Sequence, residues 1–268
     1  MRPFLKWPGG KYRLIDRICA VLRPGKKLIE PFTGSGAVFL NTQYDEYVLA
    51  DRNPDLINLY RHLLDEDDVF ISYSRRYFVP KNNLPERFYA LREQFNRSAD
   101  TRRRSALFLY LNRHCYNGLC RYNSKGEFNS PFGRYLRPYF PEAEMRSFIT
   151  AARRATLMHA DFLDSMRLAG RGDVVYCDPP YAPLSASAHF TDYHVGGFAW
   201  TDQLALSRQA QRLSGQGVQV VISNHDTPEI QTLYRSAGAH ILRFDVRRTI
   251  SCNTARRERV GELLTVFG

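Results

Sequence analysis

Residues 27–36 decide the fold, and they read Lys27-Leu28-Ile29-Glu30-Pro31-Phe32-Thr33-Gly34-Ser35-Gly36. The first six residues have the length and apolar character of a short buried strand, and Thr33 to Gly36 form a glycine-containing turn. The apolar segment 37–41 that follows is expected to open a helix. A strand, a glycine turn and a helix in this order are typical of α/β proteins.

The same alternation of strands and helices continues outward from this unit. Residues 47–50 form an apolar strand that ends at Asp51, and Asn53-Pro54-Asp55 begins a helix. Further strands are expected at 156–159, 173–177, 218–223, 240–245 and 263–267, with helices at 201–213 and 227–237. The alternation predicts a parallel sheet.

A long central segment interrupts this pattern. Two helices are expected there, at 85–96 and 101–114, and a turn-rich stretch dense in Asn, Gly, Tyr and Arg follows up to Pro141. We therefore predict a core built from residues 1–55 and 145–268, with an inserted, mostly helical subdomain at 56–144.

The composition indicates a globular protein with a polyanionic partner. Hydrophobic residues make up 44% of the 268 residues, which excludes a disordered chain, and the formal net charge is +11. Residues 92–140 hold ten Lys and Arg against three Asp and Glu, so this stretch within the insertion carries +7 of the net +11. Within it, the run Arg102-Arg103-Arg104 is expected to be a solvated helix start close to a nucleic-acid backbone.

The cysteines and the apolar segments argue against a zinc protein, a secreted protein and a membrane protein. Five scattered cysteines without zinc-site spacing indicate reduced thiols and no metal. No apolar run has the length of a signal-peptide core or of a membrane span. We expect a cytoplasmic protein that does not associate with membranes.

The glycine turn is a candidate cofactor site, because ligands of open parallel sheets bind beyond the carboxyl ends of strands. A dinucleotide site would have a small residue three positions after Gly36, where Phe39 stands, and this disfavours a nicotinamide or flavin enzyme. Asp51 is placed to bind both hydroxyls of a ribose, and Asp161 is a weaker candidate for an adenine amine. An ordinary glycine loop and a helix cap remain the alternatives.

Asp178-Pro179-Pro180-Tyr181 follows the apolar run 174–177. The two prolines remove backbone donors and fix the turn, which leaves carbonyl oxygens beside a carboxylate and an aromatic ring. This arrangement suits an amino group, whose two hydrogens would go to Asp178 and to the carbonyl of Pro179 while Tyr181 stacks on the base. Accepting both hydrogens favours the pyramidal nitrogen that attacks a methyl sulfonium.

At this point the sequence resembles the amino-methyltransferases that act on DNA, and closely the Dam-type adenine-N6 methyltransferases that modify GATC. The resemblance spans nearly the whole chain and rests on four blocks, residues 4–11, 30–36, 116–123 and 178–181. It implies an α/β Rossmann-like sheet, S-adenosylmethionine as the cofactor, and N6 methylation of adenine in double-stranded DNA. It also implies a monomer in the cytoplasm or nucleoid of a bacterium, or one encoded by a phage.

The resemblance, together with the residue types, gives a set of expected sites. The cofactor-binding residues are Trp7, Lys11, Phe32, Gly34, Gly36, Asp51, Asp161 and Asp178, and the catalytic residues are Asp178, Pro179 and Tyr181. The target adenine must be flipped out of the duplex, and Tyr116 with Asn117 would insert at the vacated site. Residues 182–198 would either close over the flipped base or form a disordered connection.

The DNA contacts are expected in the insertion and at the N-terminus. Arginine forks match the two major-groove acceptors of guanine, which makes Arg121 and Arg134 the expected base readers. The resemblance adds Lys6, Leu119, Pro131 and Tyr135 as recognition contacts, and Arg92, Arg113, Asn123 and Asn129 suit phosphates.

Two rival functions remain open on the sequence alone. The first is a methyltransferase of the same chemistry that acts on RNA or on a protein amide. The second is a catalytically inactive DNA-binding protein that keeps the fold. The basic, aromatic insertion favours nucleic acid over a protein amide, and the intact Asp178 and Tyr181 favour an enzyme.

Overall fold

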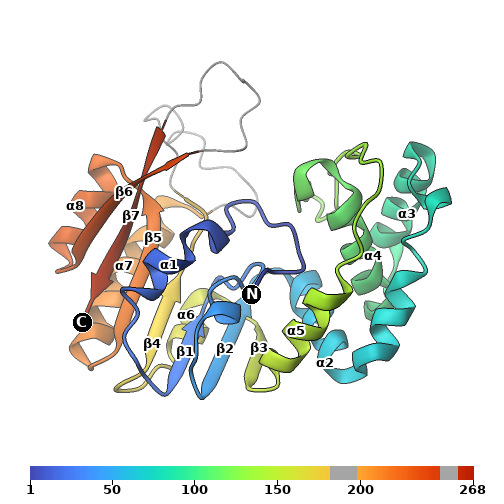
Figure 1. Cartoon of the computed structure of the whole chain (residues 1–268). Coiled ribbons are helices and arrows are strands. Elements are labelled where there is room, and N and C mark those ends of the chain that lie inside the picture. Colours follow the sequence, from blue (N-terminus) through green and yellow to red (C-terminus); the bar gives the residue numbers. More distant parts are fainter. Residues whose placement is uncertain (182–197, 248–258) are drawn as a thin grey trace. The chain divides into compact units, whose positions relative to one another are not determined.

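A seven-stranded sheet organises the protein (Figure 1). The computed structural model describes residues 1–181, 198–247 and 259–268. The strands are β1 (Lys27–Glu30), β2 (Glu46–Asp51), β3 (Ala155–His159), β4 (Val174–Cys177), β5 (Gln219–His225), β6 (His240–Arg247) and β7 (Arg259–Phe267), in the spatial order β3-β2-β1-β4-β5-β7-β6. The predicted α/β class is confirmed.

The predicted parallel arrangement is right for the early strands and wrong for the last one. β2 pairs in parallel with β3, and β4 pairs in parallel with β1 and with β5. β7 instead runs antiparallel to both β5 and β6. A parallel strand needs a crossover of a dozen or more residues, usually a helix, and residues 248–258 between β6 and β7 are too few for one.

The chain forms two compact units. The first consists of Met1–Cys19 and Thr33–Ala160, and the second of Ala20–Phe32 and Asp161–Gly268. The expected division into a core and a recognition subdomain at 56–144 concerns function, and it stays a prediction.

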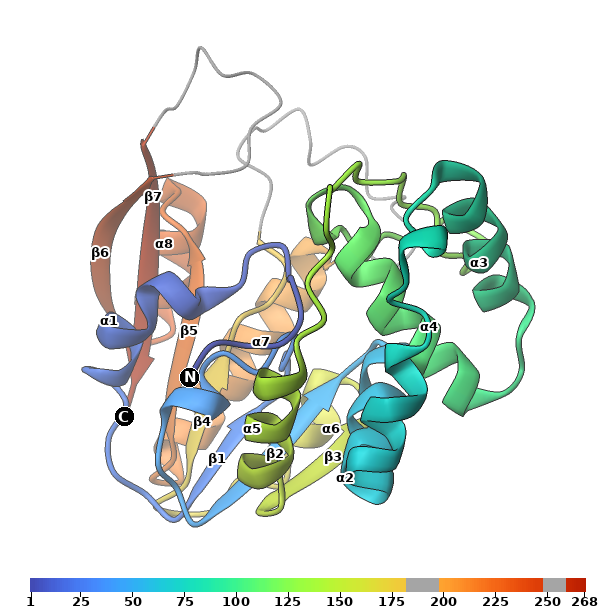
Figure 2. The same ribbon diagram turned by 45° about the vertical axis from the view of Figure 1, so that its right-hand side comes forward.

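The helices of the first unit lie largely between β2 and β3 in the chain. They are α1 (Ile15–Cys19), α2 (Pro54–Arg75), α3 (Pro85–Arg97), α4 (Thr101–His114) and α5 (Glu142–Ala152). The helices expected at 85–96 and 101–114 are confirmed, and α2 and α3 both pack along α4 (Figure 2). α5 was not expected from the sequence, although its buried Met145, Phe148, Ile149 and Ala152 recur with helical spacing.

The helix expected at 37–41 is reduced to one short 3₁₀ turn, Phe39–Asn41. The side chain of Asn41 donates to the carbonyl of Ala37, and the hydroxyl of Thr42 donates to that of Val38. Side chains that bond to nearby backbone groups in this way compete with helix continuation.

Residues 102–104 lie in the first turn of α4, so the predicted helix start is confirmed, but the expectation that their side chains are solvated is wrong. All three arginines are partly buried. Arg102 Nε lies 2.6 Å from Glu66 Oε2, Arg103 donates to Gln94, and Arg104 binds Asp55. The acceptors come from α2 and α3, which flank the first turn of α4, so tertiary packing gives these cations partners that the local sequence does not show.

An aromatic cluster holds the N-terminal segment inside the first unit. Phe4 is fully buried, with its ring centroid 5.8 Å from Tyr60 on α2 and 5.4 Å from Phe148 on α5. Phe39 packs edge-on against Phe148 and Tyr47. Burying a phenylalanine side chain stabilises the folded state by about 1.5 to 3 kcal/mol. The buried Phe4 therefore anchors the segment 5–11 that follows it.

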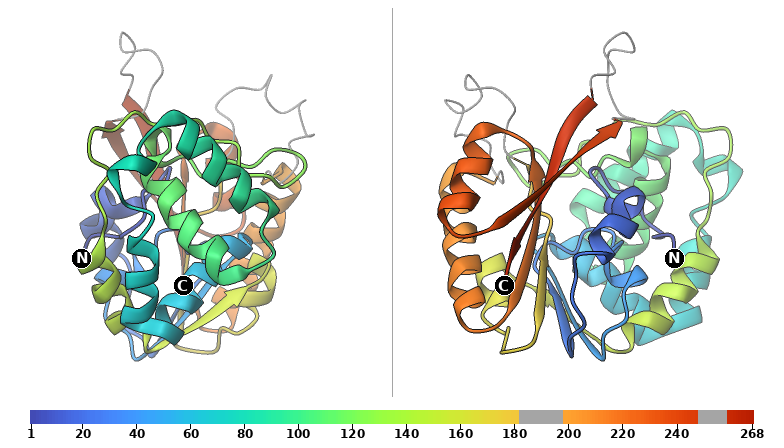
Figure 3. Two further views of the ribbon diagram at one scale, coloured as in Figure 1. Left: turned by 90° about the vertical axis from the view of Figure 1, so that its right-hand side faces the viewer. Right: turned by 60° about the vertical axis from the view of Figure 1, so that its left-hand side comes forward.

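In the second unit, α7 (Trp200–Gly215) and α8 (Pro228–Ser236) lie side by side next to the paired strands β6 and β7 (Figure 3, right). The short helix α6 (Phe162–Met166) completes the described helices of this unit. A buried polar group fixes the end of β5, since Gln203 Oε1 accepts from Asn224 Nδ2 at 3.1 Å and from Tyr234 Oη at 2.9 Å. The carboxyl end of β5 is therefore rigidly placed.

The thiols in the described part of the chain are as predicted. Cys19, Cys115, Cys120 and Cys177 are free, and burial raises the pKa of Cys115 and of Cys120 to about 12. Burial also raises the pKa of Cys19 and of Cys177, so all four thiols are protonated at neutral pH. Among the described residues, no helix is both long and apolar enough to cross a bilayer.

The buried His114 predicts a pH dependence of stability. Burial lowers its pKa to about 4, and its Nδ1 lies 2.8 Å from the carbonyl oxygen of Tyr110. Between pH 6.5 and 4 the unfolded chain binds a proton at this histidine that the folded chain does not, so the free energy of unfolding falls as the pH is lowered through this window. The contribution is about 3 kcal/mol.

Urea unfolding at several pH values checks this. His114→Phe should make the slope of unfolding free energy against pH shallower in that window, and His240→Asn, at an exposed histidine, should not. An unchanged slope in His114→Phe would contradict the assignment.

Candidate functional site

The glycine turn at residues 33–36, here called the glycine loop, has backbone geometry that requires glycine. Gly34 and Gly36 have φ of +47° and +70°, in the left-handed region. A Cβ on Gly34 would lie 2.7 Å from Trp7 Nε1, so the indole of Trp7 rests directly on this backbone. Tyr60 Oη donates to the carbonyl of Gly34 at 2.5 Å and holds it from the other side.

The carboxylate of Asp51 joins the glycine loop to the start of α2. Its Oδ2 accepts from the backbone N–H of Gly34 at 3.0 Å, and its Oδ1 accepts from that of Asn53 at 2.9 Å. Burial raises the pKa of Asp51, and these two hydrogen bonds oppose that shift. Asp51 is only partly buried, and each oxygen keeps a second lone pair for a ligand hydroxyl.

The expected N-terminal cofactor residues lie against the same loop. Lys11 is buried, and its Nζ donates to the carbonyl of Gly9 at 2.7 Å. A Cβ on Gly10 would lie 3.8 Å from Ser35 Oγ, which places residues 9–11 beside the glycine loop. The structure thus brings Trp7, Lys11, Gly34, Gly36 and Asp51 together.

One buried hydroxyl in the loop fits a polar ligand. Thr33 is buried, and its Oγ1 has no hydrogen-bond partner among the described residues. A buried polar group is normally satisfied. Together with the acceptors of Asp51, this hydroxyl gives the loop the chemistry to hold a ribose-containing cofactor.

In the second unit, Asp178 lies directly after β4 at a turn whose Pro179 is buried. Tyr181 is held on two sides. Its Oη donates to Glu262 Oε2 at 3.2 Å, and its ring packs edge-on against His225 with centroids 4.5 Å apart. Burial, Asp178 and Glu262 raise the pKa of Tyr181 well above its usual value, so it stays a neutral phenol.

Phe32 and Asp161 lie in the second unit as well. The ring of Phe32 stacks on Phe162 at 5.5 Å and meets Phe198 edge-on at 5.5 Å. Asp161 caps α6, because its Oδ1 accepts from the backbone N–H of Leu163. β1 and β4 are parallel, so Phe32 after β1 and Asp178 after β4 belong to the same edge of the sheet.

A tight cluster in the first unit unites four of the expected DNA contacts. Lys6 Nζ lies 3.7 Å from the centre of the Tyr135 ring, and the backbone N–H of Asn117 donates to Tyr135 Oη at 3.0 Å. Tyr116 is 47% exposed, which leaves its ring available to a partner. A Cβ on Gly118 would lie 2.3 Å from Lys6 Cβ, so this turn and the N-terminal segment touch closely.

The expected base readers both present their side chains to solvent. Arg121 is exposed and donates to Asn129 Oδ1 at 2.8 Å and to the Asn129 carbonyl at 3.3 Å. Arg134 is exposed and has a φ of +53°. Pro131 is exposed, and Leu119 is partly buried.

The expected phosphate contacts are more enclosed. Arg92 donates to the carbonyl of Ser130, and Arg113 donates to the carbonyls of Tyr139 and Phe4. The Oδ1 of Asn123 accepts from the backbone N–H groups of Lys125 and Glu127 and shapes the turn. The charges of Arg92 and Arg113 can act on a polyanion, but part of the donors of both side chains is used inside the protein.

Two residues that orient side chains of the candidate site were not expected from the sequence. Asn112 accepts from the backbone N–H of Lys6 and donates to its carbonyl at 2.6 Å, which ties Lys6 to α4. Glu262 orients Tyr181 from β7. Neither is near its partner in sequence, and no local pattern marks them.

Two expectations are not addressed by this geometry. The lid expected at 182–198 lies outside the described residues except for Phe198. No group of three or more His, Cys, Asp or Glu side chains suited to a metal ion occurs in the part of the chain that the structure covers.

The known proteins and the family that this chain resembles are described as adenine-specific DNA methylases or methyltransferases. The sequence model of the family described as D12 class N6 adenine-specific DNA methyltransferase matches residues 7–250. A protein of Serratia marcescens named DNA adenine methylase is 52% identical over 267 residues, which is 99% of this chain and 98% of that protein. A protein of the same name from Escherichia coli (strain K12) is 50% identical over 266 residues, covering 99% of this chain and 95% of its own length.

The contact between Gly34 and Trp7 predicts a loss of stability on adding one methyl group. Gly34→Ala forces a left-handed alanine and displaces the indole, and we expect it to lower the free energy of unfolding by at least about 2 kcal/mol. Gly238→Ala is the matched control, because its φ is +89° and nothing lies within 4 Å of the added Cβ. Denaturant unfolding of both variants checks this, and equal losses would contradict the close approach of Trp7.

Proposed function

Because the chain belongs to the family of D12 class N6 adenine-specific DNA methyltransferases, we propose that it methylates the adenine of GATC in double-stranded DNA. The chemistry of the family, transfer to adenine N6 from S-adenosylmethionine, is that of this chain. The finer proposal concerns the duplex, the GATC site and flipping of the base. The observation that carries the catalytic assignment is the turn of Asp178 and Pro179 after β4, with Tyr181 fixed by Glu262.

The turn acts as a clamp for an amino group. The carboxylate of Asp178 and the carbonyl of Pro179 accept the two hydrogens of adenine N6, which draws the nitrogen lone pair out of conjugation with the ring. Tyr181 stacks on the base, and its contacts with Glu262 and His225 hold the ring in a single orientation. S-adenosylmethionine, when bound, supplies the electrophilic methyl group.

Magnitudes decide which part of the clamp matters most. A hydrogen bond to a charged carboxylate contributes about 1.5 to 3 kcal/mol. Holding two reacting groups in line can remove roughly 7 to 11 kcal/mol of barrier. Positioning of the amine by Asp178, Pro179 and Tyr181 therefore accounts for more of the rate than the strength of any one contact.

Cofactor-binding residues are proposed for each unit by itself. In the first unit these are Trp7, Lys11, Gly34, Gly36 and Asp51, with the carboxylate of Asp51 accepting from ribose hydroxyls. In the second unit they are Phe32, Asp161 and Asp178. The acceptors of Asp51 and the buried hydroxyl of Thr33 support this assignment.

DNA recognition is proposed to follow the division of roles expected from sequence. An adenine amine inside a duplex is paired, so the base must leave the stack before it can react. The exposed ring of Tyr116, with Asn117, takes its place. The exposed guanidinium groups of Arg121 and Arg134 read bases in the major groove.

The remaining recognition residues are assigned by group. Lys6, Leu119, Pro131 and Tyr135 add recognition contacts, and Arg92, Arg113, Asn123 and Asn129 contact phosphates. Two further expectations belong to the same proposal: the protein acts as a monomer, and it works in the bacterial cytoplasm, where its DNA substrate lies.

Transfer of labelled methyl from S-adenosylmethionine to a GATC duplex and to a base-shuffled duplex tests the proposal. Nucleoside analysis should find labelled N6-methyladenine from the GATC duplex alone. Asp178→Ala should lose detectable turnover and keep DNA binding, whereas Asp164→Ala, at an exposed carboxylate on α6, should stay active. Label on both duplexes would discard GATC, and a tenth or more of the single-turnover rate in Asp178→Ala would remove its catalytic role.

Arg121 gives a separate prediction about specificity. Arg121→Ala should cost about 1 to 3 kcal/mol of discrimination at one base position and leave the other positions unchanged. Single-turnover rates on GATC and on duplexes altered at one non-target position measure this. Arg212→Ala, an exposed arginine on α7, is the control. Full discrimination at every position in Arg121→Ala would show that another residue reads the base.

A further inference from the structure

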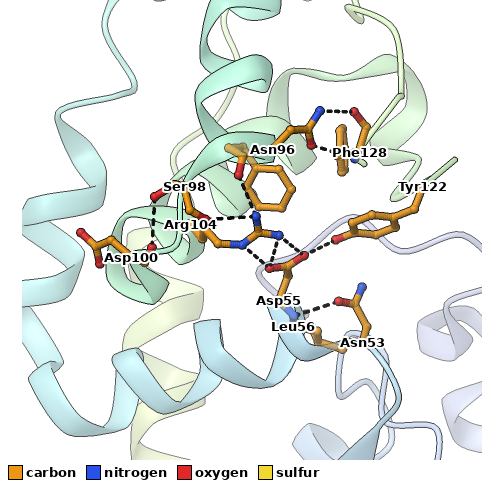
Figure 4. A network of polar contacts seen from close by, with 10 residues as sticks. Asn53, Asp55, Leu56, Asn96, Ser98, Asp100, Arg104, Tyr122 and Phe128 are labelled. Atoms are coloured by element: carbon orange, nitrogen blue, oxygen red, sulfur yellow. Dashed lines mark hydrogen bonds and ion pairs between the residues drawn. The ribbon is translucent and has the colours of Figure 1, made fainter. Parts of the chain in front are cut away.

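The buried carboxylate of Asp55 is the centre of a polar network in the first unit (Figure 4). Arg104 donates two hydrogen bonds to it, from Nε to Oδ1 and from Nη2 to Oδ2, each at 3.0 Å. Tyr122 Oη donates to Oδ2 at 2.9 Å. The three residues come from α2, α4 and the turn-rich segment after α4, so one carboxylate joins three separate parts of the unit.

The network begins next to Asp51. The backbone N–H of Asn53 donates to Asp51 Oδ1, and the side chain of Asn53 in turn accepts from the backbone N–H groups of Asp55 and Leu56. Asp51 and Asp55 are therefore fixed relative to each other by the helix cap of α2. Asp51, which is proposed to bind the cofactor, and Asp55, which binds Tyr122, therefore keep a fixed separation.

The network ends at a hairpin formed by residues 121–129. Tyr122 bridges to Phe128, and the backbone N–H of Asn129 donates to the carbonyl of Arg121 at 2.9 Å. Asn96 on α3 binds both the N–H and the carbonyl of the buried Phe128. The hairpin is thus anchored on one strand by Asp55 and on the other by Asn96.

Arg121 is adjacent to the anchored tyrosine. Successive residues of an extended strand point to opposite faces, and accordingly Tyr122 is directed inward to Asp55 while Arg121 is exposed. A bidentate contact of a guanidinium with a base edge tolerates little displacement. The position of Tyr122 therefore sets the position of the Arg121 fork.

We propose that Asp55 and Tyr122 are positioning residues for base discrimination, which hold the hairpin of Arg121 in a fixed place relative to the loop of Asp51. This inference rests on the proposed role of Arg121 as a base reader. Neither residue contacts the DNA in this account, and both act through Arg121. Arg104 serves the same end by keeping the Asp55 carboxylate oriented and neutralised.

The test uses Tyr122→Phe, which removes the hydroxyl and keeps the ring against Phe128. Tyr139→Phe is the matched control, since Tyr139 Oη also donates to a carboxylate, that of Glu144, at 2.9 Å, but lies outside the hairpin. Single-turnover methyl transfer is measured on a GATC duplex and on duplexes altered at one non-target position. Thermal unfolding of each variant is measured alongside.

We expect Tyr122→Phe to lose about tenfold in discrimination at the base position that Arg121→Ala affects, and at no other. Tyr139→Phe should keep full discrimination. In the double variant with Arg121→Ala and Tyr122→Phe, discrimination should fall no further than in Arg121→Ala alone, because effects that act through one residue are not additive.

Four outcomes would overturn the inference. A uniform fall in rate on all duplexes would make Tyr122 a purely structural residue, and additive losses in the double variant would give it a separate route. Full discrimination in Tyr122→Phe beside a loss in Arg121→Ala would overturn the inference and leave the proposed function standing. Full discrimination in Arg121→Ala would overturn both.

Discussion

The hydrogen bonds that the Asp51 carboxylate accepts from Gly34 and Asn53 are the constraint on which the first unit depends. They tie both the glycine loop and the cap of α2 to the carboxyl end of β2. A carboxylate that is partly buried is costly unless backbone donors satisfy it. Here those donors belong to the glycine loop and to the cap of α2, so the same two hydrogen bonds stabilise the acid and fix its position.

Two glycines let side chains of the N-terminal segment lie directly on the backbone of a turn. Gly34 lies under the indole of Trp7, and Gly118 lies under the side chain of Lys6, both at positive φ. In each case the absence of a Cβ lets the N-terminal segment lie directly on a functional turn. Phe4 between Tyr60 and Phe148 makes this possible, because it anchors that segment in the hydrophobic core.

Much of the fold was predictable because its signals are local. The bounds of α4 agree with the expected 101–114, since Asp100 caps the helix and Cys115 follows it in an extended conformation. The segment 37–41 was mispredicted as a helix, because the competing side-chain bonds of Asn41 and Thr42 do not follow from apolar spacing. β7 was placed correctly in the chain, but its antiparallel pairing depends on which strand edges remain open.

The sequence by itself determined the chemistry: the block from Asp178 to Tyr181 indicates a site for an amino group, and its resemblance, with three other blocks, to the amino-methyltransferases of DNA indicates methyl transfer. Tertiary structure alone decided which partners hold the residues of the candidate site, and of the network around Asp55, in place. The bonds of Glu262 to Tyr181, of Asn112 to Lys6 and of Tyr122 to Asp55 join residues 81, 106 and 67 positions apart. The physical reason is that a catalytic group is specified by its own atoms, whereas its orientation is specified by partners that only folding brings within hydrogen-bond distance.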